Sequence, residues 1–177
     1  PFMASKDYTY TYFLYQDLQK VKKEHLFPDI VYKERSYILE PTFAQTMEFF
    51  DEMDKCDMHA FDIEVANQEM SCISFAYNDK LAISIPFTQG GANYWTPPQE
   101  MAIFRRIART LGDPNIKSVA QNTSFDSTFL FRKYSIAPKN LEDTMIAHAI
   151  LLPEFPKGLD FITTSYTDIP YYKDDGK

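Results

Sequence analysis

The chain is short of glycine, of cysteine and of positive charge, and each shortage excludes a class of protein. Only 5 of its 177 residues are glycine, whereas 45% are hydrophobic and 16% aromatic, which excludes a disordered or low-complexity chain and allows a sizeable core. The two cysteines, Cys56 and Cys72, lack metal-site spacing and are expected to be reduced thiols. A formal net charge of −7 disfavours a protein that coats nucleic acid, but it suits an acidic site that binds divalent cations.

Long apolar runs are also lacking. No run reaches membrane-spanning length, and the N-terminal residues lack the basic-then-apolar pattern of a signal peptide. We therefore expect a cytoplasmic protein with no membrane partner.

Residues 1–34 differ in composition from the rest of the chain. A tyrosine-rich start leads into a basic cluster at residues 20–23, and residues 16–25 are predicted to form a helix. We interpret residues 1–34 as an extension or the tail of a preceding domain, and residues 35–177 as a second domain. A solvent-exposed helix face explains the lysines better than a nucleic-acid contact, and both interpretations stay open.

Beyond this extension, strand-like and helix-like segments alternate. Phe43, Met47, Phe50 and Met53 recur at the three-to-four spacing of an amphipathic helix, whereas residues 59–65 alternate as a half-buried strand does. The predicted elements are strand 36–40, helix 41–56, strands 59–65, 70–77 and 80–87, loop 88–98, helix 97–113, strand 116–122, and helices 123–136, 141–153 and 158–168. This order predicts an α/β sandwich whose sheet combines an antiparallel hairpin portion with a later parallel strand.

Two carboxylates interrupt the apolar segment HAFDIEV. Side chains alternate along a strand, so Asp62 and Glu64 point to the same face and repel one another. Asp126 and Asp143 each lie near the start of a predicted helix, where the helix dipole alone explains a carboxylate. Together, however, Asp62, Glu64 and Asp126 supply the oxygen donors that Mg²⁺ prefers. A site with two such ions can activate water and stabilise the leaving oxygen of a phosphodiester.

These segments resemble a known family. FDIE at 61–64, QNTSFD at 121–126 and LEDTM at 141–145 resemble, in this order, the 3′–5′ exonuclease domain of family A DNA polymerases, which belongs to the DEDD exonucleases. The resemblance covers residues 36–172. Within the family, the tail SYTDIPYYKDDGK is most similar to phage polymerases. It implies a ribonuclease H-like α/β fold, with a mixed sheet, an antiparallel hairpin portion and flanking helices.

The resemblance also implies a site and a substrate. Two Mg²⁺ or Mn²⁺ ions would be held by the catalytic carboxylates Asp62, Glu64 and Asp126. The implied substrate-binding residues are Gln121, Asn122 and Phe125. The implied partners are the single-stranded 3′ end of DNA and the polymerase domain of the same polypeptide. The reaction would release nucleoside monophosphates from the DNA. If the source is a phage, the implied location is the cytoplasm of its bacterial host. From the residues alone, Asn122 is equally explained as a helix N-cap, and Phe125 is better explained as a core residue.

The family's third motif supplies a fourth carboxylate, as Tyr-x-x-x-Asp or His-x-x-x-x-Asp. Tyr171 and Asp175 have the right spacing, but Pro170 and Gly176 favour a loop, and the segment follows Asp143 too closely for the family's order. We therefore expect the exonuclease-like domain to be incomplete at its C-terminus. Little or no nuclease activity is expected from this chain alone.

Three alternatives stay open. A ribonuclease D-like 3′–5′ exoribonuclease would use the same metal chemistry, so the motifs do not separate DNA from RNA. A catalytically inactive exonuclease-like module would serve as a scaffold. A generic binding domain would carry these acids incidentally.

Several residues outside the motifs receive structural interpretations. The aromatic residues in or beside loop 88–98 are explained equally as a hydrophobic plug or as base-stacking residues: Phe87, Tyr94 and Trp95. The arginines of helix 97–113 are expected to form a solvent-facing stripe: Arg105, Arg106 and Arg109. His148 is expected to be buried in the core, and His59 has no partner at a recognisable spacing.

Overall fold

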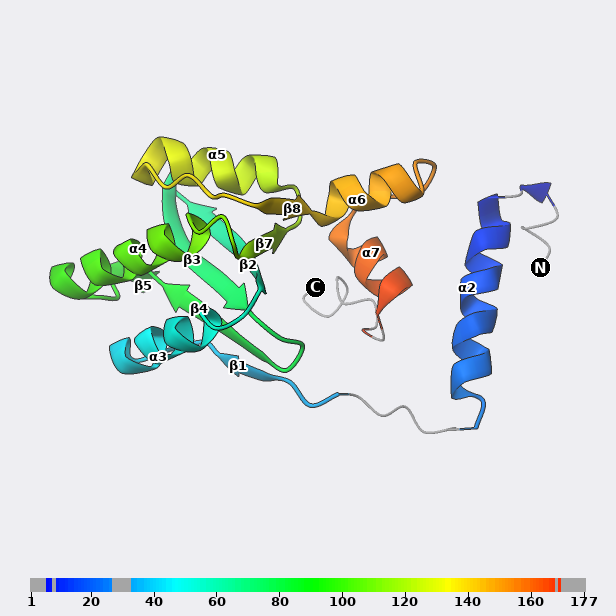
Figure 1. Cartoon of the computed structure of the whole chain (residues 1–177), viewed down its shortest axis with the longest axis horizontal. Coiled ribbons are helices and arrows are strands. Elements are labelled where there is room, and N and C mark those ends of the chain that lie inside the picture. The colour runs from blue at the N-terminus through cyan, green and yellow to red at the C-terminus, as the bar shows by residue number, and fades with distance from the viewer. Residues whose placement is uncertain (1–5, 8, 27–32, 168, 170–177) are drawn as a thin grey trace. The chain divides into compact units, whose positions relative to one another are not determined.

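The computed structural model describes residues 6, 7, 9–26, 33–167 and 169 (Figure 1). The chain divides into two compact units, one formed by Glu34–Ile146 and the other by Pro1–Lys33 together with Ala147–Lys177. The predicted division between residues 34 and 35 stays a prediction. The segment 171–175, which has the spacing of the family's third motif, lies outside the described residues. No helix in the described ranges combines the length and the apolar character needed to cross a membrane.

A six-stranded sheet forms the centre of the larger unit. Its order is β1-β4-β3-β2-β7-β8. The strands are β1 (Ser36–Ile38), β2 (Met58–Ala66), β3 (Glu69–Ala76), β4 (Leu81–Pro86), β7 (Lys117–Ala120) and β8 (Leu141–Asp143). Strands β2, β3 and β4 form an antiparallel meander, whereas β1 pairs with β4, β7 with β2, and β8 with β7 in parallel. The predicted mixed sheet with an antiparallel hairpin portion is therefore confirmed.

Three helices lie around this sheet (Figure 1): α3 (Phe43–Met53), α4 (Pro97–Leu111) and α5 (Thr123–Tyr134). Helix α3 begins with a capping box in which the Thr42 side chain accepts from the Gln45 amide, and α4 begins with prolines in its first turn. Both helices bury their periodic apolar residues against the sheet, as the sequence predicts. The fully buried members of this core include Phe50, Met53, Ile103, Ile107 and Leu111.

Strand β2 separates the core from an open face. Phe61 and Ile63 are 3% and 5% exposed and belong to the core, whereas Asp62 and Glu64 between and beyond them are exposed. The alternation predicted for HAFDIEV is therefore present. Because the apolar residues fix the strand's register, they also fix the side to which the two acids point.

Two predicted elements need correction. The loop predicted at 88–98 contains a small hairpin of β5 (Thr88–Gln89) and β6 (Ala92–Asn93), because Gly90 and Gly91 adopt φ values of +59° and +82° that suit a tight turn. The helix predicted at 141–153 is instead strand β8 followed by α6 (Thr144–Leu151). Three residues are too few to show strand periodicity, so only the pairing with β7 reveals β8.

The aromatic residues beside the hairpin pack inward. Phe87 and Trp95 are buried in the core, and the hydroxyl of Tyr94 donates to the Pro41 carbonyl at 3.2 Å. The hydrophobic-plug interpretation is confirmed, and the base-stacking interpretation is wrong for these residues.

Arg106 also differs from its predicted solvent-facing position. Its guanidinium lies 2.9 Å from Asp51 and 3.1 Å from Asp54, and it covers the Phe50 ring at 5.5 Å. Only 18% of its side chain is exposed. The acids of the preceding helix α3 attract it, which the helical pattern of α4 alone does not reveal.

The smaller unit contains α2 (Thr9–Glu24), α7 (Leu159–Tyr166) and the C-terminal part of α6. The helix predicted at 16–25 thus begins earlier, at Thr9. The Phe13 ring packs edge-on against Phe155 and Phe161, at centroid distances of 4.5 and 5.5 Å. The Lys20 ammonium donates to the Thr164 carbonyl at 2.6 Å, near the C-terminal end of α7.

Both interior histidines are buried. His148 is 2% exposed, as predicted, and its Nδ1 lies 3.1 Å from the Tyr166 hydroxyl. His59 is 1% exposed, and its Nε2 lies 3.0 Å from the Ser118 hydroxyl on the neighbouring strand β7. The sequence did not reveal this partner, because it comes from a strand 59 residues away. Burial lowers the pKa of His59 to about 4, although the charge of Asp54 opposes the shift.

We predict that His59 weakens the fold in acid. Its folded pKa is lower than its unfolded pKa, so its contribution to stability is present above pH 6.5 and is lost as the pH falls toward 4. His59→Gln retains a partner for Ser118 but does not titrate. When the pH is lowered from 7.5 to 4.5, the free energy of unfolding should therefore fall by about 2 kcal/mol more for wild type than for this variant. Urea unfolding at both pH values measures the difference. A difference that is independent of pH would contradict the prediction.

Candidate active site

The predicted carboxylates come from two elements. Asp62 and Glu64 lie on the open face of β2, and Asp126 lies in the first turn of α5, which follows β7 directly. Because β7 is the parallel neighbour of β2, the start of α5 is brought beside the middle of β2. The order of the strands in the sheet therefore brings together acids that are far apart in the sequence.

The surroundings of Asp62 and Glu64 are open and small. Across the sheet, Asp62 is paired with Ser74 and Glu64 with Cys72. A bulge follows immediately, and the hydroxyl of Ser71 donates to the Glu64 carbonyl at 3.0 Å. Such a bulge bends the strand and re-aims the side chains beside it. Small neighbours leave this face accessible to a ligand.

Asp126 is the buried member of the group. Only 3% of it is exposed, and burial, followed by the negative charge of Asp62, raises the pKa of its carboxyl to about 6. A hydrogen bond from the Ile63 backbone acts in the opposite direction, and the charge of Asp143 adds to the rise. A carboxyl whose pKa is raised in this way, and which faces another carboxyl, lies where a bound cation would be stabilised.

Asp62 is subject to the same two effects, desolvation and charge repulsion, to a smaller extent. Its side chain is exposed, but nearby protein atoms desolvate the carboxyl in part, and this desolvation together with the charge of Glu64 raises the pKa of Asp62. Asp62 thus repels Glu64 on one side and Asp126 on the other. The three predicted acids form a chain of neighbouring charges with Asp62 in the middle.

The fit of this group to a divalent cation is partial. Its carboxylate oxygens are the donors that Mg²⁺ and Mn²⁺ prefer. Within the described ranges, however, no three His, Cys, Asp or Glu side chains stand close enough together to hold a metal ion. The described chain therefore offers neighbouring pairs of ligands, Asp62 with Glu64 and Asp62 with Asp126, rather than a closed cage.

Asp143 has a different role from the other acids. Its carboxylate accepts hydrogen bonds from the amides of Asn122 at 3.1 Å, Thr123 at 2.8 Å and Met145 at 2.8 Å. Burial alone would raise the pKa of Asp143, but these hydrogen bonds lower it below the ordinary value. The sequence interpretation as a helix-start acid is confirmed for its own helix. Its larger contribution, capping α5, was missed.

Asn122 has the position of an N-cap but not the function. Its backbone is left-handed, with φ +60°, and its side chain makes no capping hydrogen bond, because Asp143 takes the amides that a cap would bind. The Asn122 side chain is exposed. The N-cap interpretation is therefore wrong for its side chain, and that side chain is available to a substrate.

Phe125 and Gln121 lie on either side of this turn. Phe125 is 54% exposed, so the prediction of a core residue is wrong. Gln121 is half-buried, and its side-chain oxygen accepts a hydrogen bond from the Thr144 hydroxyl. The structure thus leaves Phe125 and Asn122 facing solvent near Asp126, whereas Gln121 braces the start of α6.

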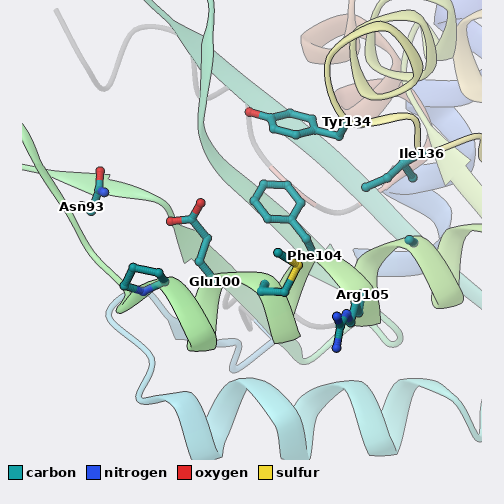
Figure 2. Close-up of a pocket in the computed structure, with 9 residues that line it drawn as sticks. Asn93, Glu100, Phe104, Arg105, Tyr134 and Ile136 are labelled. Atoms are coloured by element: carbon teal, nitrogen blue, oxygen red, sulfur yellow. The ribbon is translucent and has the colours of Figure 1, made fainter.

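A groove of about 500 Å³ lies elsewhere in the same unit. It is lined by Phe104 and Arg105 of α4 and by Tyr134 and Ile136 at the end of α5, among others, and Figure 2 shows the Phe104 and Tyr134 rings close together in it. None of the predicted site residues lines this groove. The carboxylates lie on an open face instead, which suits a polymer more than a small enclosed molecule.

Several solved structures with a similar fold are nucleases. The chain is similar to Brucella melitensis NrnC with bound Mg²⁺ (17% identity, TM-score 0.53, 77% of this chain) and to the catalytic core of Trypanosoma brucei RRP6 (16%, 0.64, 84%). It is also similar to Escherichia coli RNase D, an exoribonuclease involved in structured RNA processing (16%, 0.58, 80%). The chain spans 62%, 40% and 36% of those three chains. The predicted ribonuclease H-like fold of the DEDD exonucleases is thus confirmed.

A family model described as 3′–5′ exonuclease, and named for family A DNA polymerases, matches residues 41–177. The chain therefore belongs to this 3′–5′ exonuclease family. No curated protein matches it in sequence.

We predict that Asp143 determines whether the start of α5 is stable. Asp143→Ala leaves several amides without their partner and should lower the free energy of unfolding by about 3 kcal/mol. The neighbouring Glu142 makes only an exposed ion pair with Lys117, at 3.1 Å, so Glu142→Ala should change stability little. Urea unfolding of both variants measures the difference, and equal losses would contradict the assigned role.

We also predict that Asp126 is destabilising without metal. Its folded pKa of about 6 exceeds the unfolded value, so its contribution to stability is full below pH 3.8 and is lost as the pH rises through 6. In a chelator at pH 7.5, Asp126→Asn should therefore raise the free energy of unfolding by about 2 kcal/mol. The gain should disappear near pH 3.8. A loss of stability at pH 7.5 would contradict the electrostatic account.

Proposed function

We propose that this chain removes nucleotides from the single-stranded 3′ end of DNA, as the proofreading exonuclease domain of a family A DNA polymerase. The observation that carries the proposal is the placement of Asp62 on β2 beside Asp126 at the start of α5, which the parallel pairing of β2 with β7 brings about. These two acids occupy the two motif positions that resemble the family. A polymerase domain in the same polypeptide is the proposed partner, and the family named for such polymerases supports it.

Two divalent cations, Mg²⁺ or Mn²⁺, are the proposed cofactors. Asp62, Glu64 and Asp126 would hold them, and when bound they would supply Lewis-acid activation of water and of the scissile phosphate. The NrnC structure with bound Mg²⁺ supports magnesium for this fold. The repulsion among the three acids would be relieved by such binding, so part of the ions' affinity comes from removing a cost already present in the fold.

The chain's own residues would position the strand. Phe125 presents an exposed ring beside the acids, on which a base of the bound strand could stack. The uncommitted Asn122 amide can donate to or accept from the terminal nucleotide. Gln121, held by Thr144, would orient the turn rather than contact the base. The buried Asp126 would hold its charge at a fixed point because α5 is anchored by Asp143.

A ribonuclease D-like activity on RNA is the second candidate. It is favoured by the likeness to solved ribonucleases, which share the fold at low identity. An inactive scaffold is disfavoured, because the costly arrangement of acids persists.

Matched oligonucleotides test the proposal. The full chain is incubated with 5′-labelled dT8 or rU8 and Mn²⁺, and products are separated by length. We expect slow shortening of dT8 from its 3′ end by single nucleotides, and slower shortening of rU8. The rate should be low because no three ligands are assembled in the described ranges.

Variants give the control for this experiment. Asp62→Ala and Asp126→Ala should abolish the shortening, whereas Asp113→Ala, an acid outside the group, should leave it unchanged. Faster loss of rU8 than of dT8 would favour the ribonuclease activity. Shortening that survives both substitutions would overturn the proposal.

A further inference from the structure

One face of helix α5 carries exposed aromatic and basic side chains that the catalytic group does not use. Phe125, Phe129 and Arg132 are spaced by four and three residues, so they lie in one row along the helix. Phe125 and Arg132 are exposed, and Phe129 is half-buried between them. We call these three residues the α5 row. The row begins beside Asp126 and leads away from it.

The exposed ring of Phe125, at the start of the row, packs against the half-buried ring of Phe129. The rings of Phe125 and Phe129 are nearly parallel, with 6.4 Å between centroids and 23° between planes. Phe129 packs edge-on against Tyr134 at 6.0 Å, and the Tyr134 hydroxyl accepts from the Met70 amide at 3.3 Å. A ring braced in this way loses little freedom when a ligand stacks on it, so less of the stacking energy is lost to ordering.

The other end of the row offers a positive charge. Within the described part of the chain, Arg132 makes no ion pair, whereas its neighbour Lys133 is held by Glu69 at 2.6 Å. The chain has a formal net charge of −7, so the exposed Arg132 guanidinium adds a positive charge at the far end of the row to an otherwise acidic chain. An arginine of this kind matches a phosphate group in charge and in hydrogen-bonding geometry.

Aromatic rings that alternate with a basic side chain are the features that bind single-stranded nucleic acid. We propose that the α5 row binds the nucleotides that precede the 3′-terminal one, with a base stacked on Phe125 and a phosphate bound by Arg132. The inference rests on the proposed function, because the row is useful only if the 3′ end lies at Asp126. It assigns a substrate path that leads out of the site along α5.

The length of the row sets the length of strand it can reach. Phe125 and Arg132 are seven residues apart along α5, which corresponds to about 10 Å of helix. A stacked strand advances about 3.4 Å per nucleotide, so the row spans about three nucleotides. A dinucleotide placed at the acids should therefore not reach Arg132, whereas an octanucleotide should.

Binding of labelled strands tests the row directly. Anisotropy of 5′-fluorescein dT8 and rU8 is measured with the full chain in Ca²⁺, and gels confirm that the strands remain intact. We expect Phe125→Ala to weaken dT8 binding about tenfold, since stacking on an aromatic side chain contributes about that much per base. Arg132→Gln should weaken binding severalfold at low salt and reduce the slope of log affinity against log salt by about 0.7.

Matched variants separate the row from general effects. Phe131→Ala removes the same ring from the same helix, at 61% exposure against 54% for Phe125, but on a different side. Arg105→Gln removes the same charge from α4. Both should bind dT8 as wild type does. All four altered side chains are exposed, so thermal unfolding should be unchanged.

Strand length supplies the second readout. Competition by unlabelled dT2 should be unaffected by Arg132→Gln, whereas competition by dT8 should weaken. Equal effects of Arg132→Gln and Arg105→Gln on dT8, or wild-type binding by Phe125→Ala, would overturn the row. If the strands are shortened in an Asp126-dependent manner but the row variants bind normally, the row alone fails. If wild type neither binds nor shortens any strand, the proposed function fails and the row fails with it.

Discussion

The carboxylate of Asp143 joins the end of one strand to the start of two helices. It accepts hydrogen bonds from amides at the beginning of α5 and of α6, and it lies at the last residue of β8. Helix starts expose amides that need partners, and an anion meets that need better than a neutral group. The position of Asp126 depends on this contact, because Asp126 lies in the first turn of α5. Asp143 thus determines where Asp126 stands.

The second constraint is the conflict between packing and charge along β2. Apolar residues on one face of the strand fix its register against α3 and α4, and the acids must then occupy the other face whatever their mutual repulsion. The buried Asp126 adds to the repulsion instead of relieving it. Such a conflict persists in a folded protein where function needs it and the surrounding core can offset its cost.

Much of this arrangement could be predicted from the sequence. The alternation in HAFDIEV and the spacing of Phe50 and Met53 predicted the strand, the helix and the core, because both patterns are local. The family resemblance predicted the fold. The roles of individual residues were harder: Phe125 was expected inside and is exposed, and Asn122, for which a helix cap was one of two equal interpretations, precedes a helix that Asp143 caps.

These misses share a physical cause. Strand β8 is too short to have a period, and the capping of α5 comes from a residue 20 positions away at the sheet edge. Arg106 turned inward because acids of another helix attracted it, and His59 paired with a hydroxyl of another strand. Contacts between elements that are distant in sequence follow from topology, which no single segment contains.

His59 and Asp126 have a joint consequence for the proton balance of folding. At pH 5 the unfolded chain holds a proton on the histidine that the fold expels, and the fold holds a proton on the aspartate that the unfolded chain releases. The two transfers are opposite in sign and similar in size, so together these groups exchange almost no protons with the solvent when the chain unfolds. A flat dependence of stability on acidity would thus arise from two perturbed groups whose effects cancel, and it would hide both of them.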